Sequence, residues 1–134
     1  LDEAEGGSWV MDRILALVGR ANREAFGFDL TGFSESPQIA RYGADREGHF
    51  DWHADIGDGP LARQRKLTMV VQLSPGESYA GGRLEIMADA NIRAAPRDQG
   101  SAALFPSFVL HRVTPVTEGV RHSLTIWAHG PAFR

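Results

Sequence analysis

Residues 49–55 read HFDWHAD and contain the pattern His-x-Asp twice, as His49-Phe50-Asp51 and as His53-Ala54-Asp55. Polar and apolar residues alternate through this stretch, and a period of two is typical of a β-strand. A regular strand would place the four His and Asp side chains on one face and turn Phe50 and Trp52 into the core. The turn-forming residues IGDGP end the strand after Asp55. The stretch therefore predicts a strand with one polar face that could bind a metal.

Short segments of the same kind follow one another along most of the chain. They are rich in β-branched and aromatic residues and are separated by Gly, Pro, Asp and Ser, a texture that indicates an antiparallel sandwich or barrel. The predicted strands lie at 38–42, 48–55, 65–74, 81–88, 101–107, 111–116 and 121–129, and residues 89–100 form either an extra hairpin or a loop. Apolar residues from Trp9 to Phe26 recur at spacings of three and four, which predicts a helix that braces the outer face of a barrel of roughly seven or eight strands.

Composition limits the classes of function. The chain has 134 residues, enough for one domain, and a net charge of −3. This charge gives no electrostatic footprint for nucleic acid or for an anionic membrane, and no apolar run approaches the ~20 residues of a membrane span. We therefore expect no nucleic-acid and no membrane partner.

Cysteine is absent from the sequence. Disulfides and thiolate zinc sites are therefore excluded, so a metal would have to bind His, Asp, Glu or backbone oxygen. A chain without cysteine fits any compartment and most simply suggests the cytoplasm.

The position of each His-x-Asp copy along the strand favours one of them as a metal site. His53 and Asp55 lie at the exit of the predicted strand, where a barrel mouth opens to substrate. A third ligand could come from His111, His122 or His129. Two histidines and one carboxylate form the facial triad of non-haem Fe(II) enzymes, which leaves positions open for a 2-oxo acid and O2. The far carboxylate of such an acid needs a cation, and the Arg121 guanidinium offers a two-pronged partner.

Three longer motifs make the pattern more specific. They are RYGADREGHFDWHAD at 41–55, LSPGESYAGGRLEI at 73–86 and FPSFVLHRVTPVTEGVRHSLTIWAHGP at 105–131. Together they resemble the Fe(II)- and 2-oxoglutarate-dependent dioxygenases of the prolyl-4-hydroxylase-like type, over about residues 38–134. The resemblance implies a mostly β fold, a double-stranded β-helix or jelly-roll barrel backed by one or two N-terminal helices. It implies a single domain over 1–134, with the helix at about 9–26 and the catalytic barrel at about 38–134.

The resemblance also assigns roles to individual residues. It makes His53, Asp55 and His111 the iron ligands and Arg121 the partner of the 2-oxoglutarate C5 carboxylate. Tyr42 falls where the family has a tyrosine near the cosubstrate. Further candidates for the cosubstrate pocket are Thr125 and Trp127, which alternate with Arg121 on its strand, and Gln72, which stands where related enzymes often have a tyrosine.

The implied activity is hydroxylation of a C–H bond with Fe(II), 2-oxoglutarate and O2, and with ascorbate as the reductant. A prolyl residue of a peptide or protein is the first expected substrate, and a free amino acid or another small molecule is the alternative. Residues 56–64 could form a mobile lid over the site. The sequence carries no information on oligomeric state.

Two other classes of function remain open. One is a metal-containing jelly-roll module that binds a ligand without turnover, and the other is a zinc hydrolase that would need Asp51 or Glu85 as its general base. For the remaining polar residues we expect ordinary roles: His49 and Asp51 as a hydrogen-bonded pair or a support for the ligands, His122 and His129 at solvent or a strand edge, and Tyr79 in turn packing.

Overall fold

The computed structural model describes residues 8–46, 48–88 and 90–133. Of the predicted domain 1–134, residues 1–7, 47, 89 and 134 lie outside the described residues. Helix α1 covers Ser8–Ala21, and a π-helical turn at Asn22–Phe26 follows it. Gly27 ends this turn with φ at 64°, a left-handed conformation that favours glycine. The predicted helix at 9–26 is thus a helix followed by a separate turn.

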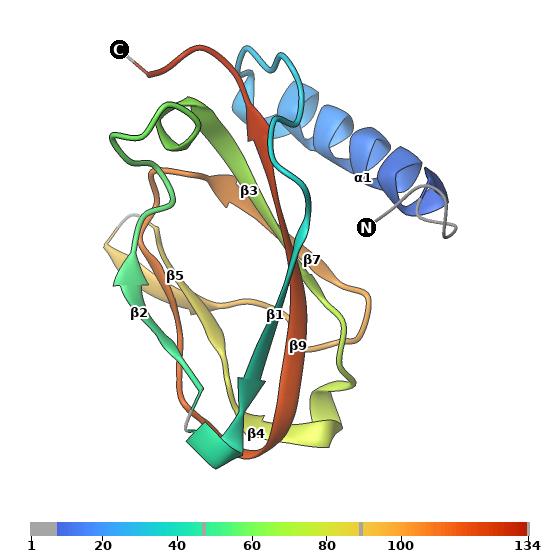
Figure 1. The fold of residues 1–134 in the computed structure, drawn as a ribbon, viewed down its shortest axis with the longest axis vertical. Helices are drawn as coiled ribbons and strands as arrows, with labels where there is room; N and C mark the ends of the chain where they lie inside the picture. Colours follow the sequence, from blue (N-terminus) through green and yellow to red (C-terminus); the bar gives the residue numbers. More distant parts are fainter. Residues whose placement is uncertain (1–7, 47, 89, 134) are drawn as a thin grey trace.

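Nine strands, all paired antiparallel, are present in the described residues and form two sheets (Figure 1). The first sheet has the order β1-β9-β3-β7, with β4 beside β9, and the second has the order β2-β8-β5-β6. The first comprises β1 (Gln38–Gly43), β3 (Arg65–Gln72), β4 (Tyr79–Gly81), β7 (Ala102–Pro106) and β9 (Val116–His129). The second comprises β2 (Phe50–His53), β5 (Leu84–Ala88), β6 (Asn91–Ala94) and β8 (His111–Val113). Short 3₁₀ turns lie at Ala44–Arg46, Ala62–Gln64 and Gly76–Ser78.

The predicted mostly β fold with an N-terminal helix is confirmed, and its strands form an open sandwich. The two sheets face each other, and within the described residues no strand of one sheet pairs with a strand of the other. The expected barrel is therefore not closed by hydrogen bonds. Of the two alternatives for residues 89–100, the extra hairpin is present, because β6 pairs with β5 in a regular antiparallel register.

Helix α1 covers the outer face of the first sheet (Figure 1). Ile14 and Val18, one helical turn apart, pack in a buried cluster with outward-facing side chains of β3 and β9: Leu67, Met69, Leu124, Ile126 and Ala128. Because side chains alternate along a strand, the intervening residues of β3 and β9 face the second sheet. The predicted brace is therefore confirmed, and it leaves the inner face free for a polar cavity. Of the helices in the described residues, none combines the length and apolar character that a membrane span requires.

Two β-bulges interrupt the alternation next to this cavity. Between Phe50 and His53 of β2 the register against β8 shifts, and between Arg65 and Leu67 of β3 the register against β9 shifts. An extra residue in one strand turns the following side chains to the other face. Phe50 and His53, three residues apart, consequently line the same cavity, as do Arg65 and Thr68.

Truncation of the buried core should cost far more than the same truncation at the surface. Ile126 is 1% exposed beneath α1, whereas Ile92 on the edge strand β6 is 53% exposed. We expect Ile126→Ala to lower the free energy of unfolding by about 2–5 kcal/mol, because it leaves a cavity in the core. Ile92→Ala should cost less than about 1 kcal/mol, since surface substitutions usually change stability little. Urea unfolding of both variants measures the difference, and equal losses would contradict the assignment of this face as core.

Candidate metal centre

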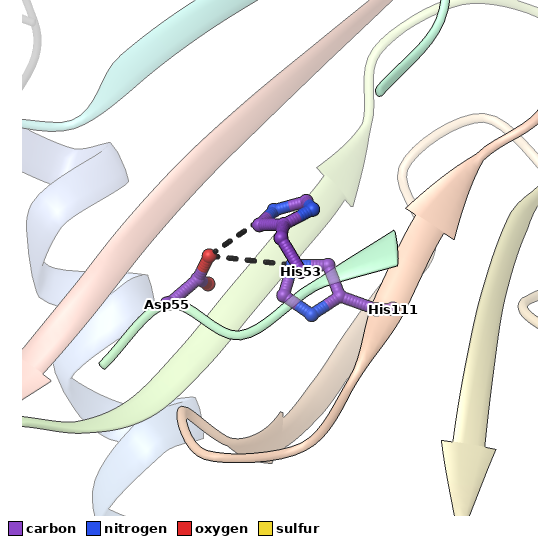
Figure 2. Close-up of side chains that lie close together, drawn as sticks. All are labelled: His53, Asp55 and His111. Atoms are coloured by element: carbon purple, nitrogen blue, oxygen red, sulfur yellow. Dashed lines mark ion pairs between the residues drawn. The ribbon is translucent and has the colours of Figure 1, made fainter. Parts of the chain in front are cut away.

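His53 and His111 lie opposite each other on neighbouring strands. They are a register pair between β2 and β8, and their ring centroids are 4.2 Å apart. The Phe50 ring stacks on the His53 ring at a centroid distance of 3.9 Å, and Phe105 lies 4.7 Å from His111. Asp55 follows β2 by two residues, and its carboxylate points at both histidines (Figure 2).

Hydrogen bonds to the main chain fix the tautomer of each histidine. Nδ1 of His53 lies 2.7 Å from the carbonyl oxygen of Asp51, and Nδ1 of His111 lies 3.0 Å from that of Val109. A carbonyl only accepts hydrogen bonds, so each Nδ1 carries the proton and donates. In the neutral imidazoles both Nε2 atoms therefore present lone pairs, and this is the form in which histidine binds metals.

The two oxygens of Asp55 have different surroundings. Oδ2 accepts hydrogen bonds from Oγ1 of Thr68 at 2.8 Å and from Nε1 of Trp127 at 3.0 Å. Oδ1 faces Nε2 of His53 at 3.4 Å and Nε2 of His111 at 3.3 Å. Buried Ser107 contacts both Thr68 and the main chain of Asp55. Its hydroxyl lies 3.0 Å from Oγ1 of Thr68, and its carbonyl oxygen accepts a hydrogen bond from the amide of Asp55. One oxygen is thus held by donors while the other is left for a cation.

This arrangement fits a divalent metal ion. The candidate ligand atoms of His53, Asp55 and His111 all lie within 4.8 Å of one another. Two nitrogen lone pairs and a carboxylate oxygen that converge on one point repel each other unless a positive charge lies between them, and either a proton or a metal ion can supply it. Two nitrogen donors and one oxygen donor suit Fe(II).

The pKa of Asp55 records the same electrostatics in the metal-free protein. Burial of the carboxyl raises its pKa, but hydrogen bonding to His111, the charge of His111 and the donors Trp127 and Thr68 outweigh burial. The net effect lowers the pKa from 3.8 to about 2. Asp55 is therefore ionised throughout the physiological range, as a metal ligand has to be.

A cavity of 510 Å³ opens between the two sheets at this point. Its wall contains the three candidate ligands together with side chains of β1, β3 and β9. Of the predicted pocket residues, Tyr42, Arg121, Thr125 and Trp127 line it, and Tyr42 lies opposite Arg121 in the register of β1 and β9. Burial is the main cause that raises the pKa of the Tyr42 hydroxyl, so Tyr42 stays protonated and can donate a hydrogen bond.

Arg121 is buried with part of its guanidinium unsatisfied. The residue is only 2% exposed, and its Nη1 atom has no hydrogen-bond partner in the described part of the chain. Its Nε donates to Oε1 of Gln72 at 3.1 Å, and Nε2 of Gln72 donates in turn to the Tyr79 hydroxyl at 2.7 Å. Gln72 therefore lies behind Arg121 and orients it, and Gln72 is absent from the lining of the 510 Å³ cavity. A buried cation without a partner costs several kcal/mol, so the cavity is suited to an anion.

Three of the sequence-based expectations around the site are wrong. Phe50 is 50% exposed and covers His53 instead of entering the core, because the bulge in β2 turns it to the cavity side. The four polar residues of 49–55 share no single face, since the Asp51 side chain is 96% exposed and that of Asp55 is 8% exposed. His129, expected at solvent or a strand edge, is 1% exposed on β9, between β1 and β3, and is hydrogen-bonded to Glu35. His122 is exposed, as expected.

Other residues of the site escaped the sequence analysis. Thr68 and Ser107 hold Asp55, and the alternation of β3 could have indicated Thr68 as an inward-facing polar residue. Tyr79, expected to pack in a turn, ends the chain of contacts behind Arg121. The general bases considered for a zinc hydrolase do not line the cavity, and the Glu85 carboxylate is bound to Arg112.

Comparison with known proteins identifies relatives of this fold and site. The sequence pattern that defines the 2OG-Fe(II) oxygenase superfamily matches residues 37–129. A PKHD-type hydroxylase of Alteromonas mediterranea is 37% identical over 83 residues, which are 58% of this chain and 37% of the relative. A PKHD-type hydroxylase of Acidovorax ebreus is 39% identical over 94 residues, which are 68% of this chain and 41% of the relative. The chain thus spans about two fifths of the length of these curated relatives.

Solved structures share the fold at lower sequence identity. A prolyl hydroxylase of Trichoplax adhaerens, in complex with a hypoxia inducible factor peptide fragment, superposes with a TM-score of 0.74. It is 19% identical, and the match covers 91% of this chain and 55% of that one. A prolyl-4-hydroxylase of Pseudomonas putida gives a TM-score of 0.64 at 24% identity, over 89% of this chain and 62% of that one.

The lowered pKa of Asp55 predicts a pH dependence of stability in the metal-free protein. A carboxyl whose pKa is lower in the folded than in the unfolded state stabilises the fold above the unfolded pKa, and this stability is lost as the pH falls through the folded pKa. From the shift to about 2, the loss attributable to Asp55 is about 2 kcal/mol between pH 5 and pH 2. In Asp55→Asn the decline of the unfolding free energy over this range should be smaller by that amount. Urea titrations at several pH values measure it, and parallel curves for the two proteins would refute the assignment.

Proposed function

Because the chain belongs to the 2OG-Fe(II) oxygenase superfamily, we propose that it is the catalytic part of a hydroxylase that uses Fe(II), 2-oxoglutarate and O2. The observation that carries the proposal is that a cluster of candidate metal ligands and a buried guanidinium nitrogen without an acceptor among the described residues line the same cavity. The candidate ligand atoms of His53, Asp55 and His111 all lie within 4.8 Å of one another, and Nη1 of Arg121 is buried without an acceptor among the described residues. A metal ion chelated by a dicarboxylic 2-oxo acid would satisfy both.

In this proposal each residue has one physical task. His53, His111 and Oδ1 of Asp55 hold the metal on one side, which leaves the cavity side open for cosubstrate and O2. Arg121, oriented by Gln72, pairs with the far carboxylate of 2-oxoglutarate, and Tyr42, Thr125 and Trp127 form the surrounding wall. When bound, the iron would allow O2 to oxidise 2-oxoglutarate and the substrate together, so that one oxygen atom enters succinate, the other converts a substrate C–H into C–OH, and CO2 is released.

The charges on the cavity wall favour a substrate residue without charge. Apart from the two histidines, which bind a metal in their neutral form, the described lining residues with an ionisable acidic or basic side chain of full charge are Asp55, Arg65 and Arg121. Arg65 is neutralised by its ion pair with Glu35. In the proposal Asp55 binds the metal, and Arg121 binds the far carboxylate of the cosubstrate. On this described wall no charge is left to pair with the ammonium and carboxylate of a free amino acid, whereas a residue within a peptide has neither group. We therefore propose a peptide-bound residue, with proline first because the relatives with this fold are prolyl hydroxylases.

Other parts of the proposal rest on the sequence alone. Ascorbate is the proposed reductant, and the cytoplasm is the proposed location. Hydroxylation of a small molecule is the competing activity, and a binding module without turnover is the competing class. The unpaired Arg121 argues against such a module, because a lectin-like domain has no use for a buried anion-binding arginine.

Release of succinate from 2-oxoglutarate tests the proposed chemistry and requires no added substrate. Protein loaded with Fe(II) under anaerobic conditions and then exposed to O2 should release succinate slowly, because cosubstrate turnover occurs at a low rate without substrate. His53→Ala should abolish release by removing a metal ligand. Arg121→Ala should raise the required 2-oxoglutarate concentration by about tenfold or more, as expected when a charge-assisted bond worth about 1.5–3 kcal/mol is lost.

Matched variants control for unspecific damage. His49→Ala removes the histidine of the other His-x-Asp copy, whose side chain is 47% exposed, and should leave succinate release intact. Arg41→Ala removes an exposed arginine of β1 and should leave the 2-oxoglutarate requirement unchanged. Absence both of turnover and of iron-dependent 2-oxoglutarate binding in the wild type would reject the oxygenase and favour the binding module.

A further inference from the structure

Glu35 and Arg65 form a largely buried ion pair next to the metal centre, with side chains 15% and 19% exposed. Nε and Nη2 of Arg65 donate to the two carboxylate oxygens of Glu35 at 2.7 and 2.6 Å. A two-bonded contact between a guanidinium and a carboxylate restricts direction as well as distance. Glu35 therefore fixes the plane of the Arg65 guanidinium, and the functions described so far leave this pair without a role beyond charge neutralisation.

The remaining contacts of Arg65 converge on Asp55. Nη1 of Arg65 donates to the backbone oxygen of Asp55 at 3.0 Å. The face of the guanidinium lies 3.8 Å from the centroid of the Trp127 ring, and Nε1 of Trp127 donates to Oδ2 of Asp55. Arg65 thus contacts the main chain of Asp55 and also the Trp127 indole that holds the Asp55 side chain.

Glu35 is itself anchored at the end of β9. The backbone amide of Ser34 donates to Nδ1 of His129 at 3.1 Å, so this nitrogen carries no proton. The proton of the neutral ring is then on Nε2, which donates to Oε2 of Glu35 at 2.8 Å. The main chain of His129 also bonds to Thr31 and Gly32. The segment between the helix and β1 is therefore tied to β9 at the point where Glu35 reaches Arg65.

We propose that Glu35 and Arg65 are positioning residues that hold Asp55 with Oδ1 toward the two histidines and Oδ2 toward Trp127 and Thr68, and that they thereby set the affinity of the site for its metal. The inference rests on the proposed function, since it takes the triad to bind a metal. Without the pair, the backbone oxygen of Asp55 loses its donor and the indole loses the cation against its face. The Asp55 main chain and the Trp127 ring are then placed less firmly, so the carboxylate is held less precisely and the three ligand atoms converge less well.

Binding of Co(II), a spectroscopic substitute for Fe(II), tests the inference without any turnover assay. Glu35→Gln removes the charge and opposes one donor of Arg65 with another, and Arg65→Met removes all three donors at similar volume. Mutation of a residue that orients a metal ligand typically lowers metal affinity by about tenfold to a hundredfold. We expect the Kd for Co(II), measured by calorimetry, to rise by about tenfold in both variants. We also expect the visible absorption bands of the bound Co(II) to change, because the ligand geometry changes.

The second sheet offers a control pair of the same residue types, in which Nε and Nη2 of Arg112 both contact Oε1 of Glu85. Glu85, with its side chain 11% exposed, accepts from Nε of Arg112 at 2.7 Å, and the Arg112 guanidinium lies 4.7 Å from the Trp52 ring. Glu85→Gln thus breaks a comparable ion pair that does not touch Asp55. Its metal-free thermal stability should fall about as much as that of Glu35→Gln, while its Co(II) affinity and spectrum stay those of the wild type.

A double variant separates positioning from a general loss of order. Trp127→Phe keeps an aromatic ring beside the guanidinium and removes the N–H that binds Oδ2, together with part of the ring volume. If Glu35 acts through this contact, Glu35→Gln combined with Trp127→Phe should weaken Co(II) binding by less than the product of the two single effects.

Each remaining outcome gives a decision. Wild-type affinity and spectrum in Glu35→Gln would overturn the inference even if Arg65→Met fails to fold. An equal loss of affinity in Glu85→Gln would also overturn it. A wild-type protein that binds no Co(II) would instead reject the proposed function on which the inference rests.

Discussion

The structure depends on a buried carboxylate whose two oxygens have opposite surroundings. Oδ2 of Asp55 is saturated by hydrogen-bond donors from β3 and β9, and Oδ1 faces two imidazoles from β2 and β8. Both sheets of the sandwich thus meet at one side chain. Ionisation of a buried acid is costly unless donors and cations surround it, and hydrogen bonding to His111, the charge of His111 and the donors Trp127 and Thr68 together lower the pKa of Asp55 despite its burial. The site is therefore selective for a positive charge on its Oδ1 side.

The rest of the fold leaves the inner face of the first sheet available for the site. Helix α1 buries the outer side chains of β3 and β9, so the alternate side chains of the same strands are available for the cavity. Because the sandwich is open, the cavity has room for a cosubstrate beside the ligands. Arg121 lies on the same wall with its Nε held by Gln72 and its Nη1 unpaired among the described residues, so the cation and the lone pairs of the triad share one space. The two features support each other as evidence for one ligand that carries both a metal-chelating end and a carboxylate.

Regular hydrophobic periodicity in the sequence predicted the elements of the fold that have a regular backbone. Apolar spacings of three and four predicted the helix. Simple alternation predicted most strands and the inward face of β9, with Arg121, Thr125 and Trp127. The structure brings His53, Asp55 and His111 together, the three ligands that the family resemblance implied, whereas position along the chain alone had left His111, His122 and His129 open as the third. Alternation failed at the two bulges, where one extra residue turned Phe50 onto His53 and Arg65 toward Asp55. The contacts of Glu35 with Arg65 and His129 join positions 30 and 94 residues apart, and no local pattern encodes such a pair.

An anaerobic crystal structure of the protein with 2-oxoglutarate and Mn(II), a redox-stable substitute for Fe(II), would decide whether one cosubstrate binds both the metal at the triad and Arg121. We expect a metal whose ligands from this chain are Nε2 of His53, Nε2 of His111 and Oδ1 of Asp55, with Oδ2 still bonded to Thr68 and Trp127. We also expect Nη1 of Arg121 to donate to the 2-oxoglutarate carboxylate farthest from the metal. A metal held by both oxygens of Asp55, a metal at His49 and Asp51, or a carboxylate that leaves Arg121 unpaired would contradict this arrangement.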